Sequence, residues 1–155
     1  MKRVLRLILP VAVSSGLLFG CAAPEPTYSP APFTPVSIDT SGSIQKVDAF
    51  VIIMDASSSM GGQPPNRFLY GKDIVNRMNQ TIPAMNYDAS LVAFGAGSCV
   101  KNNLAWQVHG PAPYSQADVA NGLAAVKCAS GWSPLETAIA ESGEALASET
   151  GKSAL

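Results

Sequence analysis

The stretch AFVIIMDASSSMGG, residues 49–62, joins an apolar run to a polar tip. Residues 47–54 form a short, largely apolar run bounded by polar residues, which is typical of a strand buried on both faces of a parallel sheet. Asp55, Ser57 and Ser59 follow this run at alternate positions. Because alternate side chains of an extended backbone point the same way, we expect these three to converge at the carboxyl end of the strand. That end is where α/β sheets bind their ligands.

Helical and strand patterns alternate through the rest of the chain. Apolar residues at helical spacing predict a helix over about residues 66–80, which Pro83 ends. Two further strands are expected over residues 89–95 and 103–110, with a hairpin loop at residues 96–102 between them. The second of these strands alternates apolar and polar residues, like a half-buried edge strand. The sequence therefore predicts an α/β fold.

Two more helices are expected after Ser115 and Ser133, because each serine precedes an acidic residue by three positions, as in a capping box. The second of these serines is followed directly by proline, a common first helical residue. Apolar residues at helical spacing are predicted to form the buried stripe of each helix. These residues are Phe68, Ile74, Val75, Met78 and Ile82 for the first helix, Val119, Leu123 and Val126 for the next, and Leu135, Ile139 and Leu146 for the last.

The chemistry of the polar tip favours a hard divalent cation. One carboxylate and two hydroxyls are oxygen ligands suited to Mg²⁺, which keeps several of its waters in protein sites. A zinc site of histidine and thiolate ligands is not indicated, because His109 is the single histidine of the chain. The alternative is a turn in which Asp55, Ser57 and Ser59 bond only the backbone amides of their own loop.

These residues resemble a known family. DASSSM, residues 55–60, resembles the Asp-x-Ser-x-Ser motif of von Willebrand factor type A domains, which forms their metal-ion-dependent adhesion site. SGWSPLETAIAE, residues 130–141, resembles the second metal loop of that family, with Ser133 where a threonine is usual and Trp132 in place of a small residue. The resemblance implies a Rossmann-like three-layer fold with one antiparallel edge strand. It also implies a site for Mg²⁺, Mn²⁺ or Ca²⁺ formed by Asp55, Ser57, Ser59 and Ser133. The alternative role of Ser133 is that of a plain helix N-cap.

The resemblance implies binding rather than catalysis. In this family, an acidic side chain of a partner typically completes the coordination of the cation, so the expected partner is a protein or another acidic ligand. The resemblance covers residues 47–155, and the family domain is longer: it has later strands and helices and a loop that usually brings a further aspartate. We therefore expect residues 46–155 to be a partial domain of marginal stability, with its central strand open along one edge.

The first 21 residues have the features of an export signal. Lys2, Arg3 and Arg6 precede an apolar stretch over residues 7–20, which is short of the about 20 residues that span a bilayer. LFGC at its end resembles the lipobox of bacterial lipoproteins, which implies a lipid on Cys21; a plain signal peptide is the alternative. Ala22 after the cysteine resembles lipoproteins sorted to the outer membrane, facing the periplasm. The proline-rich residues 22–45 are expected to form an extended linker that holds the domain off the membrane.

Removal of this signal changes the charge and the cysteine count. Seven basic residues then stand against eleven acidic ones, a formal charge of −4, which argues against nucleic acid as a partner. Cys99 and Cys128 are the cysteines that remain. An even number in an exported protein predicts a disulfide, and two buried free thiols are the alternative.

Two other functions remain as alternatives. Ser98 and Lys101 have the Ser-x-x-Lys spacing of a serine-type cell-wall hydrolase, but that chemistry needs both residues on one helical turn, and the pair lies in a predicted loop. We therefore do not expect an enzyme. A structural lipoprotein fragment without a ligand is the other alternative, which the missing strands suggest.

Overall fold

The computed structural model describes residues 29–62, 66–95, 99 and 104–155. Their sheet has the order β3-β2-β1-β4. β1 (Ala49–Asp55), β2 (Asp88–Phe94) and β4 (Ser153–Ala154) are parallel, and β3 (Ala105–Pro113) runs antiparallel to β2 at one edge. The fold is thus mixed α/β with a mostly parallel sheet, which is compatible with a Rossmann-like arrangement. The predicted edge strand is confirmed as β3.

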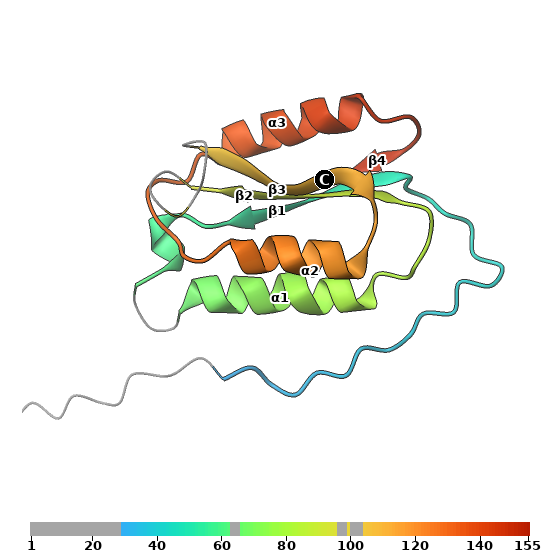
Figure 1. Cartoon of the computed structure of the whole chain (residues 1–155), viewed down its shortest axis with the longest axis horizontal. Helices are drawn as coiled ribbons and strands as arrows, with labels where there is room; N and C mark the ends of the chain where they lie inside the picture. Colours follow the sequence, from blue (N-terminus) through green and yellow to red (C-terminus); the bar gives the residue numbers. More distant parts are fainter. Residues whose placement is uncertain (1–28, 63–65, 96–98, 100–103) are drawn as a thin grey trace, which may run out of the picture.

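Helices cover both faces of the sheet. α1 (Arg67–Thr81) and α2 (Gln116–Ala125) lie on one face, and α3 (Leu135–Ala147) lies on the other (Figure 1). β1 contributes to the core on both faces: Ile52 packs in the cluster that includes residues of α1 and α2, and Val51 in the cluster that includes Ala138 of α3. This two-sided burial explains why β1 is apolar at successive positions.

The helix boundaries follow local capping chemistry in two of three cases. The Asn66 side chain accepts a hydrogen bond from the amide of Leu69 and starts α1. The Ser115 hydroxyl accepts one from the amide of Asp118, which confirms the predicted cap of α2. The predicted cap of α3 is wrong, because its N-cap is Pro134 and not Ser133.

The predicted buried stripe is confirmed for α2 and wrong in part for the other two helices. Val119, Leu123 and Val126 are at most 4% exposed. On α3, Leu135 and Ile139 are each 46% exposed, whereas Ala138 and Ser142 are buried. The small buried side chains allow α3 to pack closely against the sheet, so its larger aliphatic residues lie at the flank of the contact.

On α1 the expected Ile74 and Met78 are exposed, and Asn79 is buried instead. The Asn79 amide nitrogen donates to the carbonyl of Gln116 at 2.8 Å, and its side-chain oxygen accepts from the Tyr114 hydroxyl at 3.0 Å. These bonds satisfy a buried polar side chain, so an asparagine can occupy a position for which the apolar pattern predicts a hydrophobic residue.

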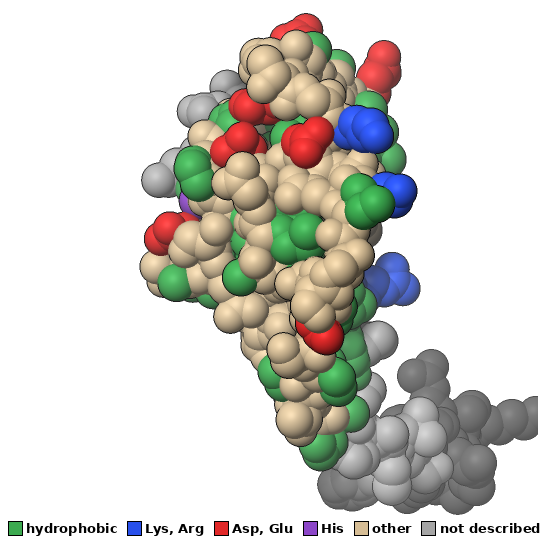
Figure 2. Space-filling view, turned by 90° about the vertical axis from the view of Figure 1, so that its right-hand side faces the viewer, with side chains coloured by type: hydrophobic (Ala, Val, Ile, Leu, Met, Phe, Trp, Pro, Cys, Tyr) green, Lys and Arg blue, Asp and Glu red, His purple; other side chains and the backbone are tan. Residues whose placement is uncertain are grey.

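The described part of the linker rests on α1. Residues 29–39 form no helix or strand, and they run beneath α1 in Figure 1. The Arg77 guanidinium donates to the carbonyl of Ala31 at 2.7 Å and lies 5.1 Å from the centroid of the Phe33 ring. Figure 2 shows hydrophobic side chains at the lower end of the molecule, where Figure 1 places the linker.

Several predicted features lie outside the described residues. They include the export signal, Cys21 and the first part of the linker, as well as most of the hairpin loop at residues 96–102. Among the helices of the described part of the chain, none has both the length and the apolar character needed to cross a bilayer.

Candidate metal site at the carboxyl end of β1

The polar loop after β1 starts from the interior of the sheet. Asp55, the last residue of β1, pairs with Phe94, the last residue of β2. The amide of Ala56 then donates to the carbonyl of Phe94 at 2.8 Å, and the chain enters a single 3-10 turn, η1 (Ser58–Met60). These contacts hold the start of the loop at the carboxyl ends of two adjacent parallel strands.

Asp55, Ser57 and Ser59 lie close together in this loop. The amide of Ser57 donates to Oδ1 of Asp55 at 2.7 Å, and the hydroxyl oxygens of Ser57 and Ser59 are 3.1 Å apart. Ser57 is fully buried, Asp55 is partly exposed, and Ser59 is exposed. The cluster is therefore fixed on its inner side and meets solvent on its outer side.

The alternative, a turn whose side chains bond only the backbone amides of their own loop, describes only part of this geometry. The bond from the Ser57 amide to Asp55 is an Asx turn, and it occupies one carboxylate oxygen. Among the residues that the structure describes, neither hydroxyl bonds a backbone amide: Ser57 is the N-cap of η1 but forms no side-chain cap bond, and its hydroxyl bonds that of Ser59 instead. The turn alternative therefore describes the aspartate, whereas the two serine hydroxyls bond each other.

A second loop is bonded to the first through the backbone. The amide of Ser130 donates to the carbonyl of Ala56 at 2.8 Å, and the amide of Ser58 donates to the carbonyl of Gly131 at 2.9 Å. Gly131 has a φ of +73°, a conformation that strongly favours glycine. The pair of bonds places the connection between α2 and α3 against the polar loop.

Ser133 follows Gly131 by two residues, which bridge at most about 7 Å of extended chain. Its side chain is exposed, and its carbonyl accepts from the amide of Leu135 at 2.8 Å. Within the described residues, no hydrogen bond engages its hydroxyl. Ser133 therefore does not cap α3, which was the alternative role for its hydroxyl.

The geometry of the two serines fits a small hard cation. Mg²⁺ binds oxygen at about 2.0–2.1 Å in octahedral geometry, which places adjacent ligand oxygens about 2.9 Å apart. The 3.1 Å between the Ser57 and Ser59 oxygens is close to that spacing. No group of three or more His, Cys, Asp or Glu side chains gathers at a metal-binding distance in the described part of the chain. A cation here would thus be held by one carboxylate, hydroxyls and water.

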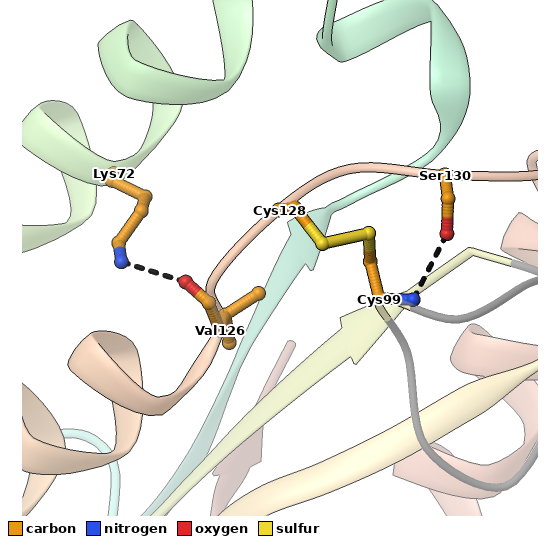
Figure 3. Close-up of a disulfide and its surroundings, with 5 residues drawn as sticks. All are labelled: Lys72, Cys99, Val126, Cys128 and Ser130. Carbon is orange, nitrogen blue, oxygen red and sulfur yellow. Dashed lines mark hydrogen bonds between the residues drawn. A yellow bond between two sulfur atoms is a disulfide. The ribbon is translucent and has the colours of Figure 1, made fainter.

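Cys99 and Cys128 form a disulfide, and their Cα atoms are 5.2 Å apart (Figure 3). The amide of Cys99 also donates to the Ser130 hydroxyl at 3.1 Å. Ser130 thus contacts both the disulfide and the polar loop, a role that the sequence alone did not indicate. A serine between an alanine and a glycine gives no distinctive pattern, so only the fold identifies it.

Lys72 of α1 contacts the start of the connection between α2 and α3. Its Nζ donates to the carbonyl of Val126, the C-cap residue of α2, at 2.7 Å (Figure 3). Burial lowers the pKa of Lys72 below its ordinary value of 10.5, and the nearby charge of Lys127 lowers it further. This lysine satisfies a carbonyl at a helix end and is not part of the polar cluster.

The other candidate sites offer fewer groups that could bind a cation or react. A hollow of about 740 Å³ lies at the opposite end of the sheet, between linker residues and the segments around Ile82 and Tyr114. Its lining contains no charged side chain, so it does not offer the carboxylate that a cation needs. Ser98 and Lys101, the residues of the hydrolase alternative, lie outside the described residues.

No protein-family profile, curated protein or solved structure matches this chain.

Proposed function

We propose that this chain is an exported lipoprotein whose folded part is a cation-dependent binding module of the von Willebrand factor type A kind. The observation that carries the proposal is the 3.1 Å spacing of the Ser57 and Ser59 oxygens beside Asp55. Within the described part of the chain, neither hydroxyl bonds a backbone amide, and the spacing suits adjacent ligands of one hard cation.

The order of strands in the sheet supports the proposed similarity to von Willebrand factor type A domains. The sequence resemblance implies that the strand before DASSSM is central, and β1 lies inside the order β3-β2-β1-β4. The antiparallel strand at the edge and the helices on both faces also agree with the implied architecture. β4 pairs only with Ala49 and Phe50, so the rest of β1 has a free edge in the described part of the chain.

In the proposed site, Asp55, Ser57 and Ser59 would hold Mg²⁺ or a similar ion, and Ser133 would reach it directly or through water. A bound divalent cation would supply coordination positions that attract an oxygen ligand from outside. The residues of the chain prepare this arrangement: the Ser57 amide orients the Asp55 carboxylate, and burial fixes the Ser57 hydroxyl. One carboxylate neutralises only half of the charge of the ion, which favours an acidic group on a protein or other ligand as the partner.

The proposed location is the bacterial envelope, with Cys21 lipidated in the outer membrane and the domain facing the periplasm. The export signal, the lipobox and the linker support this assignment. Cys21→Ser should abolish incorporation of a radioactive fatty acid into the protein, because it removes the residue that carries the lipid. Equal incorporation into the wild type and the variant would contradict the anchor at Cys21.

The test of cation binding is Asp55→Asn, measured by calorimetric titration with Mn²⁺ and Mg²⁺. Asparagine keeps an acceptor oxygen for the Ser57 amide and removes the charge, so the turn should persist while cation binding is lost. Asp39→Asn is the matched control, because the Asp39 carboxylate accepts from the Ser41 amide in the same two-residue geometry at 2.8 Å. It lies in the linker and should leave cation binding unchanged.

The two variants give a clear contrast. Equal affinity of wild type, Asp55→Asn and Asp39→Asn, all folded by circular dichroism, would exclude Asp55 as a ligand. Absence of cation binding to the wild type would instead favour a structural lipoprotein fragment without a ligand.

A further inference from the structure

The connection from α2 to α3, residues 126–134, is held in place by contacts from three other parts of the fold. Lys72 of α1 bonds the carbonyl of Val126, and Cys128 is joined to Cys99. Ser130 and Gly131 bond the loop that follows β1. Because this connection forms neither helix nor strand, such contacts define its position.

Ser130 links the disulfide to the candidate cation site. Its hydroxyl accepts from the amide of Cys99 at 3.1 Å, and its own amide donates to the carbonyl of Ala56 at 2.8 Å. Ala56 lies between Asp55 and Ser57 in the sequence. Two hydrogen bonds through Ser130 thus connect Cys99 to the backbone that carries two of the proposed ligands. Figure 3 shows the first of them, from Cys99 to Ser130.

The loop after β1 and the connection from α2 to α3 pack closely against each other, and small residues at their contact make this possible. A Cβ added to Gly61 would lie 3.3 Å from the Cβ of Ala129. A shift of the connection would therefore move the neighbouring polar loop or break the backbone bonds between them. Ser133, the proposed fourth ligand, lies on the same connection and would move with it.

We propose that the Cys99–Cys128 disulfide positions both loops of the candidate cation site, so that reduction of the disulfide weakens cation binding. This inference rests on the proposed function. Cys128 is exposed and Cys99 is partly exposed, so a dithiol can reach the bond. One thiolate of the dithiol attacks a sulfur and releases the other cysteine, and its second thiolate completes the exchange. The products are two cysteine thiols and one oxidised dithiol.

The first test compares the oxidised chain with Cys99→Ser/Cys128→Ser by calorimetric titration with Mn²⁺, at a temperature at which both are folded. The dissociation constant should rise by about tenfold or more, the size of effect typical of groups that orient metal ligands. Equal dissociation constants would overturn the inference while leaving the proposed function intact. Absence of Mn²⁺ binding to the oxidised wild type would overturn both.

A second test keeps the disulfide and alters only the link. Ser130→Ala removes the acceptor of the Cys99 amide and should weaken Mn²⁺ binding, whereas Ser130→Thr keeps the hydroxyl and should restore it. If Ser130→Ala binds Mn²⁺ as tightly as the wild type, the link through Ser130 is wrong.

A third test needs no metal. Amide hydrogen exchange of the chain, before and after reduction by a dithiol, should show faster exchange at Ser58 and Ser130 after reduction. The amide of Tyr114, which donates to the carbonyl of Tyr87 at 2.8 Å at the opposite end of the sheet, serves as the control. Equal acceleration at all three amides would indicate general destabilisation and would overturn a positioning role.

Discussion

The hydroxyl oxygens of Ser57 and Ser59 lie 3.1 Å apart, although one residue is fully buried and the other is exposed. Packing fixes the inner hydroxyl, and solvent reaches the outer one. Each hydroxyl is the hydrogen-bond partner of the other. If a cation binds between them, both serines should therefore support the site, and truncation of either one should also cost the fold their shared hydrogen bond.

Ser59→Ala should weaken Mn²⁺ binding and lower the free energy of unfolding by about 1 kcal/mol, because it removes the partner of the buried Ser57 hydroxyl. Ser57→Ala should weaken binding and also destabilise the fold by about 1 kcal/mol, through loss of a buried hydrogen bond. Calorimetric titration and urea denaturation measure the two effects. Ser58→Ala is the control, because Ser58 is exposed in the same turn but lies between the alternate positions. If Ser58→Ala weakens Mn²⁺ binding as much as Ser59→Ala does, the assignment of alternate residues is wrong.

Ser133→Ala should weaken Mn²⁺ binding without loss of stability, because the N-cap of α3 is Pro134 and no described contact uses the Ser133 hydroxyl. The matched variant is Ser115→Ala, which removes a hydroxyl that caps α2. It should lower the free energy of unfolding by about 1 kcal/mol and leave Mn²⁺ affinity unchanged. The reverse pattern, with Ser133→Ala destabilising and neutral for binding, would return Ser133 to a capping role.

Leu123→Ala should lower the free energy of unfolding far more than Ile139→Ala, because Leu123 lies in the buried stripe of α2 and Ile139 on the exposed side of α3. Leu123 is 4% exposed, and its truncation should cost about 2–5 kcal/mol. Ile139 is 46% exposed, so its truncation should cost much less. Urea denaturation gives both values. Similar losses for the two variants would show that Ile139 is covered in solution.

Tyr114 should make stability fall in alkaline solution. Burial raises the pKa of its phenol above the ordinary 10.0, with a further contribution from Tyr87. The unfolded chain therefore ionises first, so the contribution of this group is fully present below about pH 10 and is lost as the pH rises through the folded-state pKa. The lowered pKa of Lys72 acts in the opposite direction near its ordinary 10.5, because the unfolded chain there keeps the extra proton.

Tyr114→Phe isolates the tyrosine from this opposing effect. The difference in free energy of unfolding between wild type and variant should shrink between about pH 9 and about pH 11, on either side of the ordinary tyrosine pKa. Urea denaturation at each pH measures it. A difference that stays constant over this range would contradict a raised pKa.

The features that the sequence predicted best are those that depend only on residues close together in the chain. The Ser115 cap and the regular spacing of Val119, Leu123 and Val126 are local signals, and all are found in α2. The same reasoning failed for Leu135 and Ile139. An apolar stripe shows that a helix has a buried side, but not whether the sheet meets the large residues or the small ones beside them.

By itself, the sequence determined that a buried strand ends in one carboxylate and two alternate hydroxyls, because strand burial and side-chain alternation are properties of consecutive residues. It also supplied two cysteines for a predicted disulfide. Only the tertiary structure decided that Ser130 joins this disulfide to Ala56 and that Pro134, not Ser133, is the N-cap of α3. These relations join segments far apart in the chain, and their hydrogen bonds depend on how the sheet and helices pack rather than on any local pattern.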